Sequence, residues 1–155
     1  MKILEIIREL ESHAPIALQE DYDNSGLLIG SVDKEISKAL ICLDITDEVM
    51  QEAVKEGCDL VISHHPFLFK PIKQVTGKKL QDRILIEAIK QDISIYSIHT
   101  NLDNTLGGVN ARLGEQLGLA NLKILAPGKG NLRKLVTFCP LEHADKVRNA
   151  LFEAG

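Results

Sequence analysis

The residues best suited to chemistry in this chain are two adjacent histidines, His64 and His65. They follow a largely apolar run at about 59–63, which predicts a short buried strand, and they precede Pro66, where strand pairing should end. Neighbouring side chains on an extended backbone point to opposite sides, so this pair is poorly placed to chelate one ion. Each histidine could instead ligate one of two neighbouring ions, unless both are ordinary surface residues.

A third histidine, His99, follows another predicted strand at about 93–98. Asp44 in turn follows a strand predicted at about 36–43. In open α/β sheets ligands bind at the carboxyl edge of the strands, so Asp44, His64 and His99 are expected to share that edge. This convergence favours a metal or catalytic site over isolated surface histidines.

Imidazole nitrogens combined with a carboxylate oxygen suit Zn, Fe, Mn or Co better than Ca or Mg. Asp103 is the one residue between the two clusters that is placed to bridge two ions, with His64 on one ion and His65 on the other. Two ions about 3.5–4 Å apart would lower the pKa of a bridging water and deliver hydroxide to a carbonyl, amidine or phosphorus centre. His99 is predicted to orient a ligand or to transfer protons. Asp44 either supports a ligand or answers the dipole of the next helix.

A strand–helix–strand rhythm supplies the elements that position these side chains. The predicted elements, in chain order, are an amphipathic helix over 3–10, a strand-like segment within 25–30, a strand over 36–43, a helix from Thr46 to Gly57, a strand over 59–63, a helix over 79–91, a strand over 93–98 and a helix over 109–117. Such alternation implies parallel strands joined by right-handed crossovers. The predicted fold class is therefore α/β, with a mostly parallel or mixed sheet flanked by helices.

Three loop segments carry further features. Gln19–Asn24 is polar and could line a pocket, although an ordinary loop before an edge strand is the favoured interpretation. Phe67–Ile72 is an apolar loop that is predicted to pack on the protein itself rather than on a partner. Gly107–Gly108 precedes a helix and is expected to form a flexible turn, with an anion site as the alternative.

The last part of the sequence predicts a separate unit. Residues 127–131 are the best linker candidate, a strand is predicted over 132–138, and a helix over 141–151. One strand and one helix cannot bury both of their faces alone. We therefore expect one domain over 1–127, followed by an incomplete segment over 128–155.

Composition excludes several classes of protein. The formal charge of −4 gives no support to a basic nucleic-acid surface, so nucleic acid is not an expected partner. The sequence has no apolar run long enough for a membrane span, and its charged first helix does not resemble a signal peptide. The three cysteines are scattered and set in apolar surroundings, which predicts free thiols and a reducing, cytoplasmic location.

Four motifs in this chain resemble those of the Nif-three-like family. They are Tyr22–Leu27, Leu43–Thr46, Ser63–Pro66 and His99–Asn110, and they occur in the family's order and spacing within residues 1–127. The resemblance implies an α/β fold and a toroidal homohexamer with dinuclear metal centres facing an inner cavity. Members of this family are often described as homologues of the type-two form of GTP cyclohydrolase I. It also implies His64 and His65 as ligands of the two metals and Asp103 as their bridge.

The same resemblance implies further ligands, a His and a Glu close together near the end of a longer chain. This sequence has no matching pair, since His143 is followed by no such Glu at that spacing. We therefore interpret the chain as an N-terminal portion, with the residues from about 132 opening an inserted α+β domain. Two functions remain open. One is a dinuclear, metal-dependent hydrolase acting on GTP, another nucleotide or a small molecule; the other is a non-enzymatic metal-binding scaffold or regulator.

Overall fold

The computed structural model of this protein describes residues 1–126 and 135–154. They fall into two compact units, Met1–Ile124 and Leu125–Gly155. None of the helices in these residues has the length and apolar character needed to cross a membrane. All three cysteines are free thiols, as predicted.

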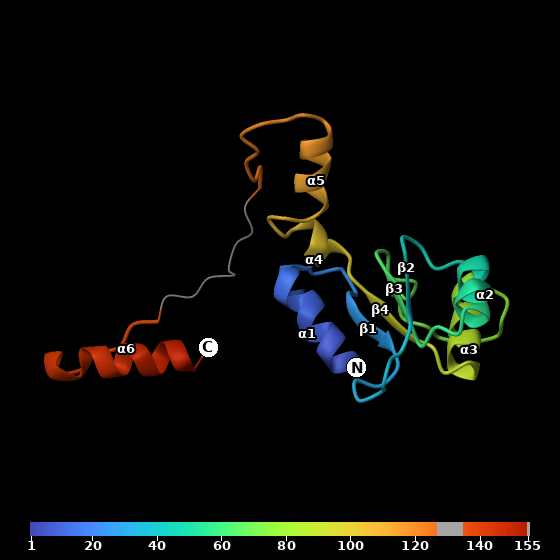
Figure 1. Cartoon of the computed structure of the whole chain (residues 1–155), viewed down its shortest axis with the longest axis horizontal. Coiled ribbons are helices and arrows are strands. Elements are labelled where there is room, and N and C mark those ends of the chain that lie inside the picture. The colour runs from blue at the N-terminus through green and yellow to red at the C-terminus, as the bar shows by residue number, and fades with distance from the viewer. Residues whose placement is uncertain (127–134, 155) are drawn as a thin grey trace. The chain divides into compact units, whose positions relative to one another are not determined.

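A four-stranded mixed sheet forms the centre of the first unit, with the strand order β1-β4-β3-β2 (Figure 1). The strands are β1 (Gly26–Ile29), β2 (Ala39–Cys42), β3 (Leu60–Ser63) and β4 (Ser94–Ser97). Strands β2, β3 and β4 run parallel to one another, and β1 pairs antiparallel with β4. Helices α2 (Asp47–Lys55) and α3 (Leu80–Lys90) lie between the parallel strands in sequence, so the predicted mixed α/β class is confirmed.

Two hydrophobic cores lie on opposite faces of this sheet. Because side chains alternate along a strand, Leu60 and Ile62 of β3 face the core on the α1 side, and Val61 faces the core beneath α2 and α3. Helix α1 (Ile3–His13) anchors to its face through Ile3, which is fully buried. Full burial of one such side chain contributes about 1.5–3 kcal/mol, so packing rather than helix propensity holds α1 in place.

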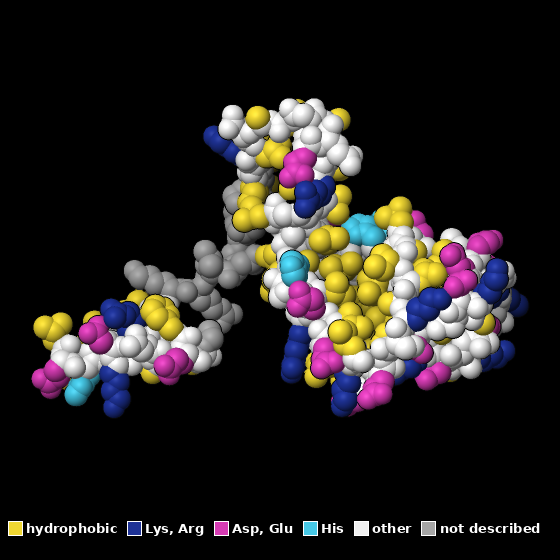
Figure 2. Space-filling model, viewed as in Figure 1, with side chains coloured by type: hydrophobic (Ala, Val, Ile, Leu, Met, Phe, Trp, Pro, Cys, Tyr) yellow, Lys and Arg dark blue, Asp and Glu magenta, His cyan; other side chains and the backbone are white. Residues whose placement is uncertain are grey.

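The outer edge of β2 is open within the described residues. Its neighbour on the sheet is β3, and its other side pairs with no strand in this part of the chain. Ile41 and Leu43 are 79% and 60% exposed there. Figure 2 shows hydrophobic side chains gathered over this region of the first unit.

The remaining elements of the first unit are η1 (Ile16–Leu18), α4 (Thr100–Asp103) and α5 (Val109–Gln116). A Cβ atom at Gly108 would collide with the carbonyl oxygen of Leu102. That crowding explains the glycine at the start of α5 as a requirement of the turn, without an anion.

The second unit contains η2 (Leu141–His143) and α6 (Ala144–Glu153), which confirms the predicted terminal helix. The strand predicted over 132–138 is wrong for residues 135–138, which have no regular structure. Leu135 and Phe138 are 72% and 95% exposed, and no second strand among the described residues of this unit is available to pair with them. Residues 132–134 of that prediction, and the predicted linker 127–131, fall within 127–134, outside the described residues.

Candidate metal centre

Three histidines meet at the carboxyl edge of the sheet. His64 and His65 directly follow β3, and His99 lies just beyond the end of β4. One nitrogen from each ring lies within 4.8 Å of the corresponding nitrogens of the other two. The ring centroids are 4.9 to 5.4 Å apart. The prediction that His64 and His99 share one sheet edge is therefore confirmed.

The backbone of the histidine pair is fixed by its neighbours. The hydrogen-bond ladder between β2 and β3 continues past the strand ends, with the His64 amide donating to the Cys42 carbonyl at 3.1 Å. The His65 amide donates in the same way to the Leu43 carbonyl at 3.0 Å. Beneath them, the buried hydroxyl of Ser63 donates to the His65 carbonyl at 2.9 Å. These bonds fix the backbone of both histidines, so their side chains start from defined positions at the sheet edge.

Each histidine ring is also held through its Nδ1 atom by an oxygen. The three bonds run from His64 to the Ile98 carbonyl (2.9 Å), from His65 to the Asp44 carboxylate (2.7 Å), and from His99 to the Asp23 carboxylate (2.8 Å). Carbonyl and ionised carboxylate oxygens only accept hydrogen bonds, so each Nδ1 carries a proton. In the neutral ring the Nε2 lone pair is then free, which is the usual arrangement of a histidine that binds metal.

Asp44 lies against His65 rather than over the start of the next helix, where Thr46 caps α2 by accepting from the Val49 amide at 3.3 Å. This is the geometry that a supporting carboxylate needs, and the role of Asp44 stays a prediction. Burial, followed by the charge of Asp44, raises the pKa of the nearby Cys42 thiol to about 11. Cys42 therefore stays protonated near neutral pH and does not add a thiolate to the donor set.

Asp103 lies on the short helix α4, with Oδ1 3.7 Å from Nε2 of His64. That gap is long for a hydrogen bond. Two ligands about 2.0–2.2 Å from one tetrahedral ion lie roughly 3.4 Å apart, so the gap suits two ligands of a shared cation better. The group whose donor atoms all lie within 4.8 Å of one another consists of His64, His65 and His99. Asp103 is not a member of that group. Bridging by Asp103 stays a prediction.

Asp23 is the supporting residue that the sequence analysis did not assign individually. Its carboxylate is fully buried and accepts from the Thr100 amide at 3.0 Å, from the Ser25 hydroxyl at 3.0 Å, and from the Thr100 hydroxyl. Burial alone would raise the pKa of Asp23, but hydrogen bonds from Thr100, His99 and Asn24 outweigh it and hold that pKa well below its usual range. A permanent anion therefore orients the His99 ring. The available signals were its place in the polar stretch 19–24 and in the family-like motif Tyr22–Leu27.

A profile of the Duf34/NIF3 (NGG1p interacting factor 3) family matches residues 1–153. The chain belongs to this family. One curated Duf34/NIF3 relative, the GTP cyclohydrolase 1 type 2 homolog of Halalkalibacterium halodurans, is 42% identical over 151 residues. That match covers 97% of this chain and 41% of the relative, so the chain spans about two fifths of the relative's length.

Solved structures agree with the Duf34/NIF3 assignment. A Bacillus cereus protein related to NIF3 has a TM-score of 0.79 and 39% identity, covering all of this chain and 43% of that protein. Reduced HcgD from Methanocaldococcus jannaschii has a TM-score of 0.76 and 42% identity, covering 81% of this chain and 50% of HcgD. Both likenesses support the α/β fold described above.

The donor set of this Duf34/NIF3 chain fits a divalent transition metal. Three imidazoles offer Nε2, one carboxylate is at hand, and the nearby Cys42 stays a thiol. The side chains of His64 and His99 are only 19% and 17% exposed, while that of His65 is 46% exposed. A cation held there would be shielded from solvent near His64 and His99 and accessible to solvent near His65. The His cluster could therefore hold a metal ion.

Proposed function

We propose that this chain carries the metal-binding part of a metal-dependent hydrolase with a dinuclear centre, which acts on a nucleotide or a similar small molecule. The observation that supports it most is the arrangement of the three histidines. Each has its Nδ1 bound to an oxygen and its Nε2 free, and the three donor atoms lie within 4.8 Å of one another.

In this proposal His64 and His65 are ligands of two ions among Zn, Fe, Mn or Co, and Asp103 bridges them. Divalent ions in the site would supply Lewis acidity and lower the pKa of water. Asp44 holds the His65 ring in position. Asp23 holds His99, which either completes the donor set or transfers protons beside it.

For the substrate, we extend the name of the curated relatives, GTP cyclohydrolase 1 type 2 homolog, to this chain. A GTP cyclohydrolase-like reaction would hydrolyse the purine ring at C8. The homohexameric assembly and the cytoplasmic location belong to the same proposal. They are supported by the resemblance to the family and by the three free cysteines.

A second candidate function is a non-enzymatic metal-binding scaffold or regulator. It is favoured by the way the site's titratable groups are engaged. His64, His65 and His99 are each held through Nδ1, and Asp23 and Asp44 are the acceptors for two of them. If His99 is also a ligand, no described residue of the cluster remains as a free acid or base.

Metal analysis combined with a turnover assay separates these functions. The purified chain is loaded separately with Zn, Mn, Fe or Co, dialysed and analysed for bound metal, and then incubated with GTP while ring opening is followed by absorbance. The hydrolase proposal expects about two ions per chain and metal-dependent turnover. Bound metal without turnover would favour the scaffold. Equal metal content in wild type and in a His64→Ala/His65→Ala variant would contradict both functions.

A further inference from the structure

The loop between β3 and α3 lies beside the candidate metal centre. Phe67 is 9% exposed and packs in the core, as predicted for this apolar loop. Phe69 and Ile72 differ from that prediction, because they remain 44% and 37% exposed. The loop therefore packs through its first residue and leaves a second aromatic ring at the surface.

The exposed ring of Phe69 stands next to a histidine of the cluster. Its centroid is 6.3 Å from that of His99, with the two rings nearly perpendicular at 85°. The ring of Tyr22, which is 67% exposed, also lies near Phe69, with the two centroids 6.3 Å apart. The Asn24 amide ties the two segments together by donating to the Leu68 carbonyl at 2.5 Å.

Two exposed aromatic rings at the mouth of a polar site are well suited to stack on a planar ring. Such stacking tolerates different bases because every base has a π-face. The pair is tilted by 56°, so neither ring covers the other face to face.

The same loop is a basic stretch of an acidic chain. The chain carries a formal charge of −4, yet residues 66–81 hold no Asp or Glu. The basic residues of this stretch are Lys70, Lys73, Lys78 and Lys79. The first acid beyond it, Asp82, is occupied by accepting from the Thr76 amide and hydroxyl, each at 3.1 Å.

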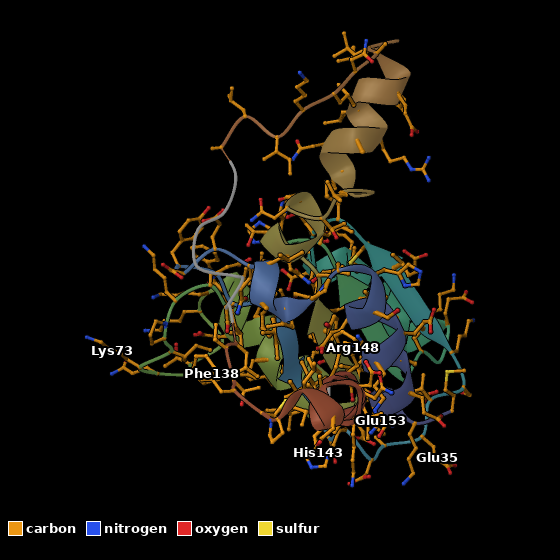
Figure 3. The ribbon with its side chains drawn as sticks, turned by 90° about the vertical axis from the view of Figure 1, so that its left-hand side faces the viewer. Glu35, Lys73, Phe138, His143, Arg148 and Glu153 are labelled. Atoms are coloured by element: carbon orange, nitrogen blue, oxygen red, sulfur yellow. The ribbon has the colours of Figure 1, made fainter. Side chains whose placement is uncertain are left out.

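A hollow of about 740 Å³ lies along this loop and meets the aromatic pair at Phe69, while Tyr22 and His99 lie outside its lining. It is lined by Phe69 and by three of the lysines, Lys70, Lys73 and Lys79. Figure 3 shows Lys73 at the outer tip of the loop, pointing away from the ribbon. Small-molecule sites occupy roughly 300–1,000 Å³, so a nucleotide-sized ligand fits this volume.

We propose that Tyr22, Phe69 and the loop lysines form a ligand subsite for a planar aromatic ring that carries phosphate groups. The ring packs against Phe69 and Tyr22 next to His99, and the phosphates lie toward Lys70, Lys73 and Lys79. This inference rests on the proposed function, because it assigns the ligand class of the same centre as a nucleoside polyphosphate. Free polyphosphate carries the same phosphate groups without the aromatic ring, so it is the alternative ligand for the lysines.

Equilibrium binding measurements with three probes test the subsite. GTP, guanosine and inorganic tripolyphosphate are titrated into the chain by calorimetry, without added metal and again with zinc. The variants are Phe69→Leu, which removes the ring, and Lys70→Gln/Lys73→Gln, which removes two charges. The matched control, Lys55→Gln/Lys90→Gln, removes two charges from α2 and α3 instead, and circular dichroism verifies that each variant folds.

The subsite predicts a different pattern for each variant. Phe69→Leu should weaken GTP and guanosine about tenfold, since one stacking contact is lost, and should leave tripolyphosphate unchanged. Lys70→Gln/Lys73→Gln should weaken GTP and tripolyphosphate about fivefold or more, lower the salt dependence of both, and spare guanosine. The control should change none of the three affinities by more than about twofold.

Three results would overturn the subsite. They are GTP affinity unaffected by Phe69→Leu, an equal loss in the lysine variant and its control, or no GTP binding by the wild-type chain. Failure of the proposed function looks different. GTP binding with the expected variant pattern but without turnover supports the subsite and contradicts the hydrolase. Turnover with an unchanged KM in both variants supports the hydrolase and contradicts the subsite.

Discussion

Replacing the buried anion Asp23 by asparagine should cost about 2–4 kcal/mol of the free energy of unfolding. Five hydrogen bonds reach this carboxylate, two on Oδ1 and three on Oδ2. An asparagine keeps one accepting oxygen and replaces the other with an amide nitrogen. If the nitrogen faces the Oδ2 side, the hydroxyls of Ser25 and Thr100 can turn and accept, but the Thr100 amide cannot.

The expected magnitude follows from that count. One backbone amide left without an acceptor costs about 1–3 kcal/mol, and loss of the charge weakens the bond from His99 by roughly 1 kcal/mol more. Urea denaturation followed by circular dichroism at pH 7 measures the difference. Asp33→Asn is the matched control, because Asp33 is 76% exposed and its loss should change stability by less than about 0.5 kcal/mol.

The pH dependence gives this prediction a second readout. The pKa of Asp23 is depressed in the folded state, so the ionised carboxylate contributes its full stability above the unfolded pKa of about 3.9. That contribution is lost as pH falls from there toward the lower folded-state pKa. The gap between wild type and Asp23→Asn at pH 7 should therefore narrow below about pH 4. A loss below about 1 kcal/mol at pH 7, or a gap that widens in acid, would refute the reasoning.

Three further predictions concern the metal site and the scaffold. The Asp103→Ala variant should lose both ions together, because a bridging carboxylate binds both, whereas His64→Ala or His65→Ala should mainly lose one ion. Metal analysis that finds two ions per Asp103→Ala chain would exclude bridging. Zinc at about 100 times its dissociation constant should raise the free energy of unfolding by about 2.7 kcal/mol in urea titrations, and a zinc effect of equal size in His64→Ala/His65→Ala would place the ion elsewhere. Thr46→Ala should cost about 1 kcal/mol, because the α2 cap is lost, and unchanged urea midpoints would show that this hydrogen bond is unimportant.

The sequence predicted the site best where strand ends alone determine position. His64 and His99 each follow a buried parallel strand, and parallel strands in register bring their carboxyl ends to one edge. The strand limits were less accurate, since β2 covers only Ala39–Cys42 of the predicted 36–43. The predicted range ended at two apolar residues, Ile36 and Leu43, that lie outside the strand.

Contacts between distant segments could not be predicted from local patterns. Asp23 and His99 are 76 residues apart, and nothing near either one identifies the other. The strand over 132–138 failed for a related reason at residues 135–138, because apolar residues in an extended stretch supply no partner strand. Phe69 was misjudged because an apolar loop residue looks the same in sequence whether it packs inward, as Phe67 does, or stays exposed.

The open edge of β2 makes the first unit prone to edge-to-edge association. Its four residues, Ala39–Cys42, include no charge and no proline, the features with which natural sheets block unwanted pairing. A strand that added there would satisfy the free backbone groups and cover the exposed side chain of Ile41. It would also end beside Asp44, which directly holds the most exposed of the three histidines. Self-association along this edge would therefore compete with entry to the site from the His65 side.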